Sequence, residues 1–569
     1  MKSFLLNNRW LLLIIILGIL PLYPLLHPGM FEGHDAQDHI ARIANFYANL
    51  QEGIIIPRWA ANLNWGYGHP ILMFLYPLPS YIASLFHWLG FSLIDATKIV
   101  FALGFALGGL TMYLWIKTMW REKAGIVASA LYLFAPYRFV DLYVRGAIGE
   151  NFFFIWPPLV LYCYYQLIKT GLVRYLIGGA FALAAMILSH NALSIMYLPF
   201  MFLYCVLLIV FSKRKLLVSI YSFLMTALGF GLSAFFWLPA YIEGKYTLRD
   251  IVTAGELFKR FEPFSRLIYS KWSHGGTGNM SVQVGIIQWI MIGVAVFLIY
   301  NLILKIKRIK DQKNNRDLKF NSYLLLILFF FFWIALFLIT PYSQIIYEKI
   351  TLFQKFQFPW RWLSLAIFPP AVIGGYFVSQ ISKRYSNQIV AGIVIAVLTV
   401  SFPYWKADGY FEKPESFYTG IYEGTTDTGE SAPIWSVRFM LEKPPAYAEV
   451  VEGKAEIQTV NHRISSRTYA VTVNSEQARI LENTLYFPGW FVSIDGNELP
   501  LTDVWWQDPA YRGLITYFVP EGEHLVEIVF RNTKVRNVSE FVSISSLFFL
   551  TGLCAMVLLL RKRSFPLSL

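Results

Sequence analysis

The sequence has few charged residues and almost no cysteine. Asp, Glu, Lys and Arg make up 15% of the 569 residues, against roughly 25% in soluble domains. With 56% hydrophobic residues, this scarcity argues against a soluble enzyme, a disordered chain or a nucleic-acid-binding protein. The three cysteines, Cys163, Cys205 and Cys554, each lie in an apolar run, so neither a disulfide framework nor a CxxC metal site is available.

What the sequence has instead is long apolar runs. A helix needs about 20 apolar residues to cross the hydrocarbon of a bilayer. About twelve runs qualify, near residues 10–28, 98–116, 124–140, 152–168, 175–190, 192–211, 216–240, 284–304, 320–340, 362–380, 388–404 and 540–560. We therefore expect a polytopic α-helical membrane protein in the cell membrane.

The basic residues predict the orientation of these spans. The net charge is +13, and alternate loops are basic, at 117–123, 169–174, 213–215, 305–319, 383–384 and 561–563. Because basic loops stay in the cytoplasm, the N-terminus is expected to be cytoplasmic. Residues 71–90 are apolar, but a span there would place the basic loops outside, and three prolines interrupt the segment. We expect an interfacial or re-entrant helix on the outer side.

The segment 405–536 is the clearest domain boundary. It contains more acidic than basic residues, and "RTYAVTV", "LITYFVP" and "HLVEIVF" alternate as strands do. Asp495-Gly496 predicts a hairpin turn, and Pro520-Glu521-Gly522 predicts another turn. The sequence therefore predicts a membrane domain (1–404), an extracytoplasmic all-β sandwich (405–536) and a C-terminal anchor (537–569).

Four aromatic residues of this β domain allow two interpretations. Trp490, Trp505, Trp506 and Tyr511 could stack on a sugar ring. The more ordinary role is that of core and interface aromatics, which burial preferences favour.

The first outside loop contains the sharpest functional signal, "GHDAQDHIARIANFYANLQEG". Its apolar spacing predicts an amphipathic helix parallel to the membrane, with Asp35, Asp38 and His39 on one side. One carboxylate could take a proton from an acceptor hydroxyl as a general base. Alternatively, the pair could bind a divalent cation together with His34 or His39. The alternative without a function is a solvated helix start, where Asp is favoured by the helix dipole.

Two more polar candidates, Arg58 and His69, lie in the next stretch, "GIIIPRWAANLNWGYGHPILMFLYPLPSY". This stretch is too rich in Gly and Pro for a plain helix, which fits a cavity lining. Arg145 and Glu150 lie between two spans, where ionisable groups suggest function. They could equally form a structural ion pair with each other or with Asp141.

Two candidates lie at span ends on the outer side. His190 either takes part in function or hydrogen-bonds to a neighbouring helix. Arg361 in "KFQFPWRWL" could hold a lipid phosphate bidentately. It could also extend to the headgroups while Trp360 and Trp362 anchor the span.

These pieces, in this order, resemble the GT-C superfamily of membrane glycosyltransferases. The first acidic motif of that fold maps onto Asp35 and Asp38, and the second onto Glu150. The motifs "GHDAQDH", "PRW", "GYGHPILMFLYPL", "RGAIGE", "FPWR" and "YFPGWFVSIDG" resemble, more closely, the YfhO-like proteins and the membrane family called 6-pyruvoyl-tetrahydropterin synthase-related. The chain contains no zinc site of the soluble pterin synthase.

The resemblance implies sugar transfer from a polyprenyl-phosphate donor to a cell-envelope glycan acceptor on the outer face. Asp35 would be the general base, and Asp38 or Glu150 would assist or bind a metal. Arg361 would hold the carrier phosphate. The further substrate-binding candidates are His39, Arg58, His69, Arg145 and His190. The acids here are three residues apart rather than adjacent, which leaves open which of them is the base.

The alternative is a non-enzymatic lipid-linked sugar transporter or an envelope assembly factor. A transporter should have internal repeats and ionisable groups near the midplane. The sequence has no clear repeat, and its ionisable clusters lie at the outer ends of spans, which favours interfacial chemistry.

Overall fold

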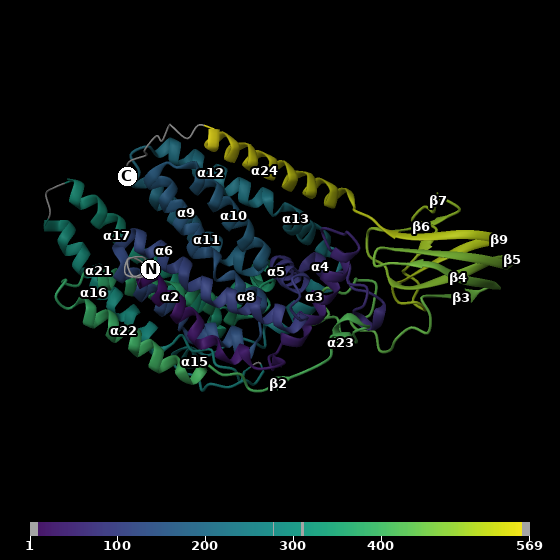
Figure 1. Cartoon of the computed structure of the whole chain (residues 1–569), viewed down its shortest axis with the longest axis horizontal. Coiled ribbons are helices and arrows are strands. Elements are labelled where there is room, and N and C mark those ends of the chain that lie inside the picture. The colour runs from purple at the N-terminus through teal and green to yellow at the C-terminus, as the bar shows by residue number, and fades with distance from the viewer. Residues whose placement is uncertain (1–8, 277, 309–311, 560–569) are drawn as a thin grey trace.

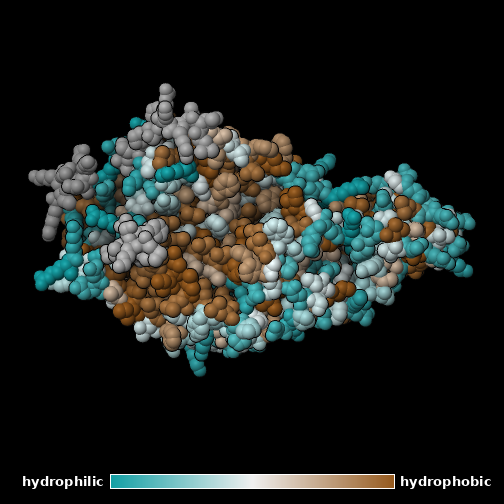
Figure 2. All heavy atoms as spheres, in the orientation of Figure 1, coloured by the Kyte–Doolittle hydropathy of each residue, from teal (hydrophilic) through white to brown (hydrophobic). Residues whose placement is uncertain are grey.

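The computed structural model describes residues 9–276, 278–308 and 312–559. A helical body carries a β-sheet domain at one end (Figure 1). Hydrophobic residues gather over the helical body, whereas hydrophilic residues cover most of the sheet domain (Figure 2). The prediction of a helical membrane protein with an all-β domain is confirmed, and the packing of that domain as a sandwich stays a prediction.

Among the described residues, eight helical segments are long and apolar enough to cross a membrane. They are α6 (Leu93–Leu133), α11 (Asn191–Val210), α12 (Lys215–Leu232), α16 (Ile286–Arg308), α17 (Gln312–Ile339), the segment Pro359–Ser379 that contains α20 (Leu363–Ala366) and α21 (Phe368–Ser379), α22 (Ser386–Ser401), and α24 (Lys534–Leu559). The remaining predicted spans fall on shorter helices, α2 (Arg9–Ile19), α9 (Trp156–Thr170) and α10 (Val173–Ser189). The number of twelve spans stays a prediction.

The long helix α6 contains two of the predicted spans. Its backbone leaves the helical region at Trp120 and Arg121. Ser129 Oγ donates to Gly109 O over 2.8 Å, although 20 residues of straight helix would separate them by about 30 Å. The chain therefore reverses at Trp120–Arg121, inside the basic stretch that was expected to connect the two spans.

The apolar segment 71–90 folds as two short helices, α4 (Ile71–Phe74) and α5 (Leu78–Trp88). The 11 residues of α5 extend about 16 Å, which is too short to cross a bilayer of about 30 Å. This length agrees with a helix that does not span.

The segment after the first predicted span forms α3 (Ala36–Gln51), which the sequence predicts as a surface helix. The structure instead packs α3 inside the protein. Its apolar residues Ile40 and Phe46 are buried, and so are Arg42, Asn45 and Asn49 on other faces. Both buried asparagines hydrogen-bond to the backbone of the loop that follows the helix. Asn49 Nδ2 donates to Trp59 O, and Asn45 Oδ1 accepts from Asn62 N.

The β domain is one seven-stranded antiparallel sheet. Two long strands, β5 (Ser466–Leu485) and β9 (Leu514–Phe530), pair along most of their length. Shorter strands pair beside them: β3 (Ala448–Glu452), β4 (Ala455–His462), β6 (Trp490–Ile494), β7 (Asn497–Glu498) and β8 (Val504–Trp505).

One turn prediction in this domain is right and one is wrong. Asp495 and Gly496 connect β6 to β7 with φ of 50° and 77°, as a type I′ hairpin needs. Pro520, Glu521 and Gly522 form no turn, because they lie inside β9. The partner strand β5 places extra residues between Val473 and Gln477 there, so a bulge accommodates the proline and bends the sheet.

Candidate functional site

Asp35 and Asp38 lie at the N-terminus of α3. Asp35 precedes the helix and is exposed, whereas Asp38 is half-buried. The backbone fixes this helix start to the loop that follows α6: Asp35 N donates to Arg145 O over 2.9 Å, and His34 N donates to Val144 O over 3.1 Å. The first acidic motif is thus attached directly to the segment that carries Arg145 and Glu150.

Asp38 faces a residue that sequence reasoning missed. Tyr422, far along the chain, donates its hydroxyl to Asp38 Oδ1 over 2.7 Å. Burial raises the pKa of Asp38 above its ordinary value, and the Tyr422 hydrogen bond and the charge of Arg42 oppose this shift only in part. A carboxylate with a raised pKa is a better proton acceptor at neutral pH.

His39 is buried beside these acids. Its Nδ1 accepts from Arg42 Nη1 over 3.1 Å, and its other nitrogen faces the backbone at Gly146 and Ile148. Burial and the positive charge of Arg42 lower the pKa of His39 well below its ordinary value, so the ring is neutral. This contact with a guanidinium is poorly suited to binding a cation.

The residues near Asp35 and Asp38 do not supply a complete metal site. Within the described ranges, no group of three or more His, Cys, Asp or Glu side chains is arranged to hold a metal ion. His39 is turned to Arg42, and Asp38 Oδ1 accepts from Tyr422. A divalent cation at Asp35 and Asp38 would therefore lack a third protein ligand of these kinds.

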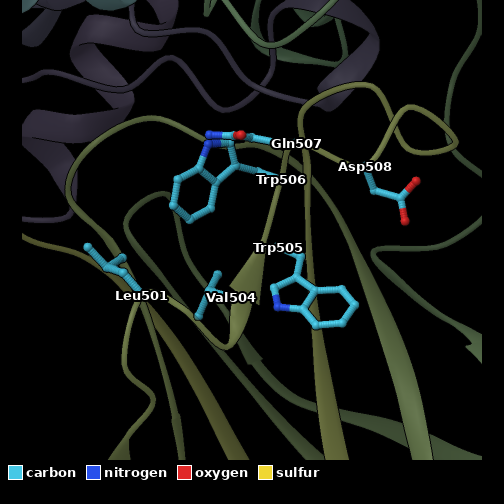
Figure 3. Close-up of a pocket in the computed structure, with 6 residues that line it drawn as sticks. All are labelled: Leu501, Val504, Trp505, Trp506, Gln507 and Asp508. Atoms are coloured by element: carbon cyan, nitrogen blue, oxygen red, sulfur yellow. The ribbon is translucent and has the colours of Figure 1, made fainter.

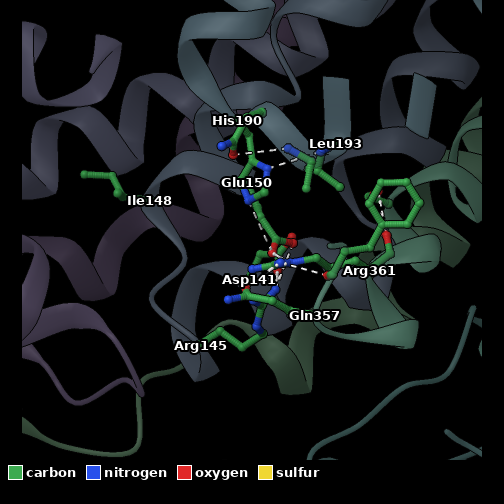
Figure 4. A network of polar contacts seen from close by, with 12 residues as sticks. Asp141, Arg145, Ile148, Glu150, His190, Leu193, Gln357 and Arg361 are labelled. Atoms are coloured by element: carbon green, nitrogen blue, oxygen red, sulfur yellow. Dashed lines mark hydrogen bonds and ion pairs between the residues drawn. The ribbon is translucent and has the colours of Figure 1, made fainter. Parts of the chain in front are cut away.

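Glu150 is the centre of a second cluster (Figure 4). It lies on the short helix α8 (Ile148–Phe153) and is 1% exposed. Arg145 Nη1 and Arg361 Nε each lie 2.8 Å from one of its carboxylate oxygens, and the Tyr137 hydroxyl donates to it over 3.0 Å. His190 Nε2 lies 3.8 Å away. The structure thus brings together four of the predicted site residues: Arg145, Glu150, His190 and Arg361.

The cluster combines two arginines, Arg145 and Arg361, with two buried carboxylates, Asp141 and Glu150. Burial raises the pKa of Asp141, which accepts from Arg145 Nη1 over 2.8 Å. Burial would also raise the pKa of Glu150, but Arg145 and Arg361 outweigh it and lower that pKa. Two guanidinium groups therefore converge on Glu150, and Asp141 holds one of them from its other side.

Tyr76 connects the two clusters. The charges of Asp35 and Arg42, and those of Glu150 and Arg361, all act on the pKa of its hydroxyl. Its ring stacks on His190 with centroids 5.0 Å apart. It also packs directly on Gly149, where a Cβ would meet the ring at 2.2 Å. Tyr76 therefore packs against the Glu150 cluster, which the backbone bond from Asp35 N to Arg145 O joins to the start of α3.

The segment 422–430, which precedes the sheet domain, covers this site. Arg42 Nη2 donates to Thr426 O, and Gln357 Nε2 donates to Glu430 Oε1 over 2.7 Å. Gln357 in turn accepts from Arg361 Nη1 over 2.9 Å. Both Gln357 and Thr426 have φ of 62°, a left-handed conformation that few non-glycine residues adopt. The segment is therefore held in an unusual conformation by contacts to both clusters.

Two predicted candidates, Arg58 and His69, lie outside both the start of α3 and the Glu150 cluster. His69 Nε2 is 3.5 Å from Asp427 Oδ1 in the covering segment. Arg58 Nη2 forms an ion pair of 2.7 Å with Glu540 on α24, which points to a structural role.

Sequence reasoning missed Tyr76, Gln357, Tyr422, Asp427 and Glu430. The only local signal was "TTDTGE" (425–430), a composition typical of turns. It predicts a loop but not the place where that loop docks.

Together, the helical body, its apolar surface and the antiparallel sheet define a polytopic membrane protein with a β domain outside the helical body. The model of one family, described as the 6-pyruvoyl-tetrahydropterin synthase related domain of membrane proteins, matches residues 72–407. The chain belongs to this family, as the sequence motifs predicted.

One curated relative is an uncharacterized protein of Lactococcus lactis subsp. cremoris (strain MG1363). It is 24% identical over 241 residues, which are 41% of this chain. The matched part spans 39% of the relative's length.

Three kinds of solved structures are similar to part of this chain. The arabinofuranosyltransferase AftD from Mycobacteria is 14% identical, with a TM-score of 0.42 over 70% of this chain and 28% of that chain. An Archaeoglobus fulgidus oligosaccharyltransferase is 14% identical, with a TM-score of 0.36 over 74% and 58%. ArnT from Cupriavidus metallidurans, bound to undecaprenyl phosphate, is 11% identical, with a TM-score of 0.31 over 65% and 79%.

Proposed function

We propose that the protein is a GT-C-type glycosyltransferase. It would move a sugar from a polyprenyl-phosphate donor to a cell-envelope glycan acceptor on the outer face of the membrane. One observation carries this proposal: the carboxylates at the start of α3 adjoin the arginine cluster at Glu150, since Asp35 N donates to Arg145 O over 2.9 Å. A proton acceptor and an anion-binding group are the two parts that transfer from a lipid phosphate requires.

In the proposed reaction, Asp35 takes the proton of an acceptor hydroxyl. The hydroxyl oxygen attacks the anomeric carbon of the donor sugar, and the bond from that carbon to the phosphate oxygen breaks. The polyprenyl phosphate leaves with the bonding electrons. Asp35 is favoured as the base because it is exposed, whereas Asp38 already accepts from Tyr422.

Arg361 is proposed to stabilise the departing phosphate. Its side chain is 11% exposed, and in the described part of the chain its hydrogen bonds use Nε and Nη1. Glu150 and Gln357 hold the guanidinium in place before substrate arrives, which reduces the entropy lost on binding. Glu150 and Asp38 are positioning residues in this scheme.

The first experiment measures consumption of a polyprenyl-phosphate sugar by purified protein in liposomes, with a cell-envelope glycan as acceptor. Asp35→Asn should lower turnover by about a hundredfold or more, because it removes the proton acceptor with little change of shape. Asp250→Asn serves as the matched control, since Asp250 is an exposed acid on α14 (Arg249–Leu257).

The outcomes separate the alternatives. Full turnover in Asp35→Asn together with lost turnover in Asp38→Asn would move the base to Asp38. Sugar-lipid movement across the bilayer without any transfer would instead support a transporter. No activity of either kind would leave an envelope assembly factor.

A further inference from the structure

The sheet domain has an open pocket of about 440 Å³. The residues of this pocket are far along the chain from both acidic motifs. Its lining residues are Leu501, Val504, Trp505, Trp506, Gln507 and Asp508 (Figure 3). This volume lies in the range of about 300–1,000 Å³ that small-molecule sites occupy. The lining combines two indole rings with an amide and a carboxylate.

Trp505 is exposed and yet fixed in place. Its side chain is 45% exposed, which leaves a large aromatic surface open. Its Nε1 donates to Thr502 O over 2.8 Å, and the Arg479 guanidinium lies 5.1 Å from the ring centroid. An aromatic ring that is already held loses little conformational entropy when a ligand stacks on it.

Trp506 is held by stacking on Tyr486, with ring centroids 3.7 Å apart and planes 11° from parallel. Its buried Nε1 has no hydrogen-bond partner among the residues that the structure describes. A buried N–H donor without a partner is uncommon in folded proteins. Trp506 therefore contributes a ring of fixed orientation to the pocket lining.

The polar groups of the pocket suit a neutral ligand with hydroxyl groups. Asp508 is held by Arg479 Nη2 at 2.8 Å and by Ala510 N at 2.9 Å, which lower its pKa and keep it an acceptor. Gln507 is exposed and offers both a donor and an acceptor. The nearby cation, Arg479, is engaged by Asp508 and Glu452, so the pocket is less suited to a phosphate.

We propose that this pocket binds a sugar ring of a neutral glycan. The apolar C–H face of the ring would stack on Trp505, and its hydroxyls would hydrogen-bond to Gln507 and Asp508. A sugar has this combination of an apolar face and a polar edge. The inference rests on the pocket and does not depend on the transferase proposal.

The test measures binding of neutral tetrasaccharides of glucose, mannose and galactose to the full-length protein in lipid nanodiscs. Titration calorimetry gives the affinity, and saturation-transfer NMR gives the sugar protons in contact. Trp505→Ala should weaken binding by about tenfold or more. Trp505→Phe should retain most of the affinity, because it keeps an aromatic face.

Leu525→Ala is the matched control, since Leu525 is also 45% exposed on the same domain but does not line the pocket. Failure of every tetrasaccharide to bind, or equal affinity of Trp505→Ala and the wild type, would overturn the proposal. Binding of lipid vesicles, in place of sugars, to the surface at Trp505 would also overturn it. Binding is measured without a donor lipid, so the result is independent of turnover.

Discussion

Asp427 is a buried carboxylate whose charge the fold stabilises. Its side chain is 4% exposed, and its two oxygens accept from Gly429 N at 2.9 Å and Ser431 N at 3.0 Å. Burial alone would raise its pKa, but His69 and the hydrogen bonds of the turn lower the pKa to about 2. The ordinary value is 3.8, so this ionised group stabilises the covering segment.

This depressed pKa predicts a pH dependence of stability. The contribution of Asp427 is fully present above about pH 4 and is lost as the pH falls towards 2. Over that window the free energy of unfolding should fall by roughly 2 kcal/mol more in the wild type than in Asp427→Asn. Thermal or denaturant unfolding in detergent between pH 2 and 7 measures it. Equal pH profiles in the two proteins would contradict the prediction, and Asp250→Asn is the control.

At the residue scale, the sequence predicted part of the candidate site, whose role in function stays a prediction. Asp35, Asp38, Arg145, Glu150 and Arg361 were identifiable because ionisable residues next to apolar spans are rare. Tyr422 and Glu430 were not, since more than 380 residues separate Tyr422 from Asp38 and neither stands out locally. Only the folded chain brings such distant residues together.

At the scale of elements, the placement of α3 depends on a close contact with the next loop. Gly146 has φ of 61°, and a Cβ there would lie 3.1 Å from Ala36 Cβ and 3.2 Å from Ala36 N. Glycine thus permits both the left-handed turn and the close approach of the helix start.

Gly146→Ala should therefore destabilise the protein by about 1–2 kcal/mol and also displace Asp35. Gly53→Ala is the matched control: Gly53 follows α3 with φ of 81°, and a Cβ there meets nothing within 4 Å. Both variants carry the conformational strain, but only Gly146→Ala should lower the turnover of the folded fraction. Equal turnover of the two variants in the liposome assay would show that the contact is unimportant.

The elements were more predictable than their packing. Each apolar run gave a helix, because the period and length of such runs are local properties. The burial of α3 on its polar side was not predictable, since Asn45 and Asn49 bond to backbone of the irregular loop after the helix, at Asn62 and Trp59, whose fold the sequence does not specify. The bend in β9 escaped prediction for a similar reason: the bulge that accommodates Pro520 lies on the partner strand.

At the scale of the whole molecule, ion pairs join the helix α24 to the helical body. Arg58 pairs with Glu540 at 2.7 Å, and the fully buried Arg536 pairs with Glu243 at 2.9 Å. Arg536 also donates to Pro488 O of the sheet domain over 2.6 Å. These contacts connect α24, the helical body and the sheet domain at one place.

Glu540→Ala should destabilise the protein more than Arg58→Ala. Loss of Glu540 leaves Arg58 close to Arg536 without the intervening anion, whereas loss of Arg58 leaves Glu540 near a remaining cation. A double-mutant cycle on thermal unfolding should give a coupling of about 1–2 kcal/mol. Additive single effects would indicate that the pair contributes only packing.

The sheet domain lies between two candidate spans, α22 before it and α24 after it, and α24 runs back along the helical body (Figure 1). A protease cut within the sheet would therefore leave two fragments, each with a helix of its own in the bilayer. Lateral diffusion would keep them within reach of each other in two dimensions, at a far higher effective concentration than in free solution. The nicked protein should accordingly remain assembled in the membrane and separate only when detergent dissolves it.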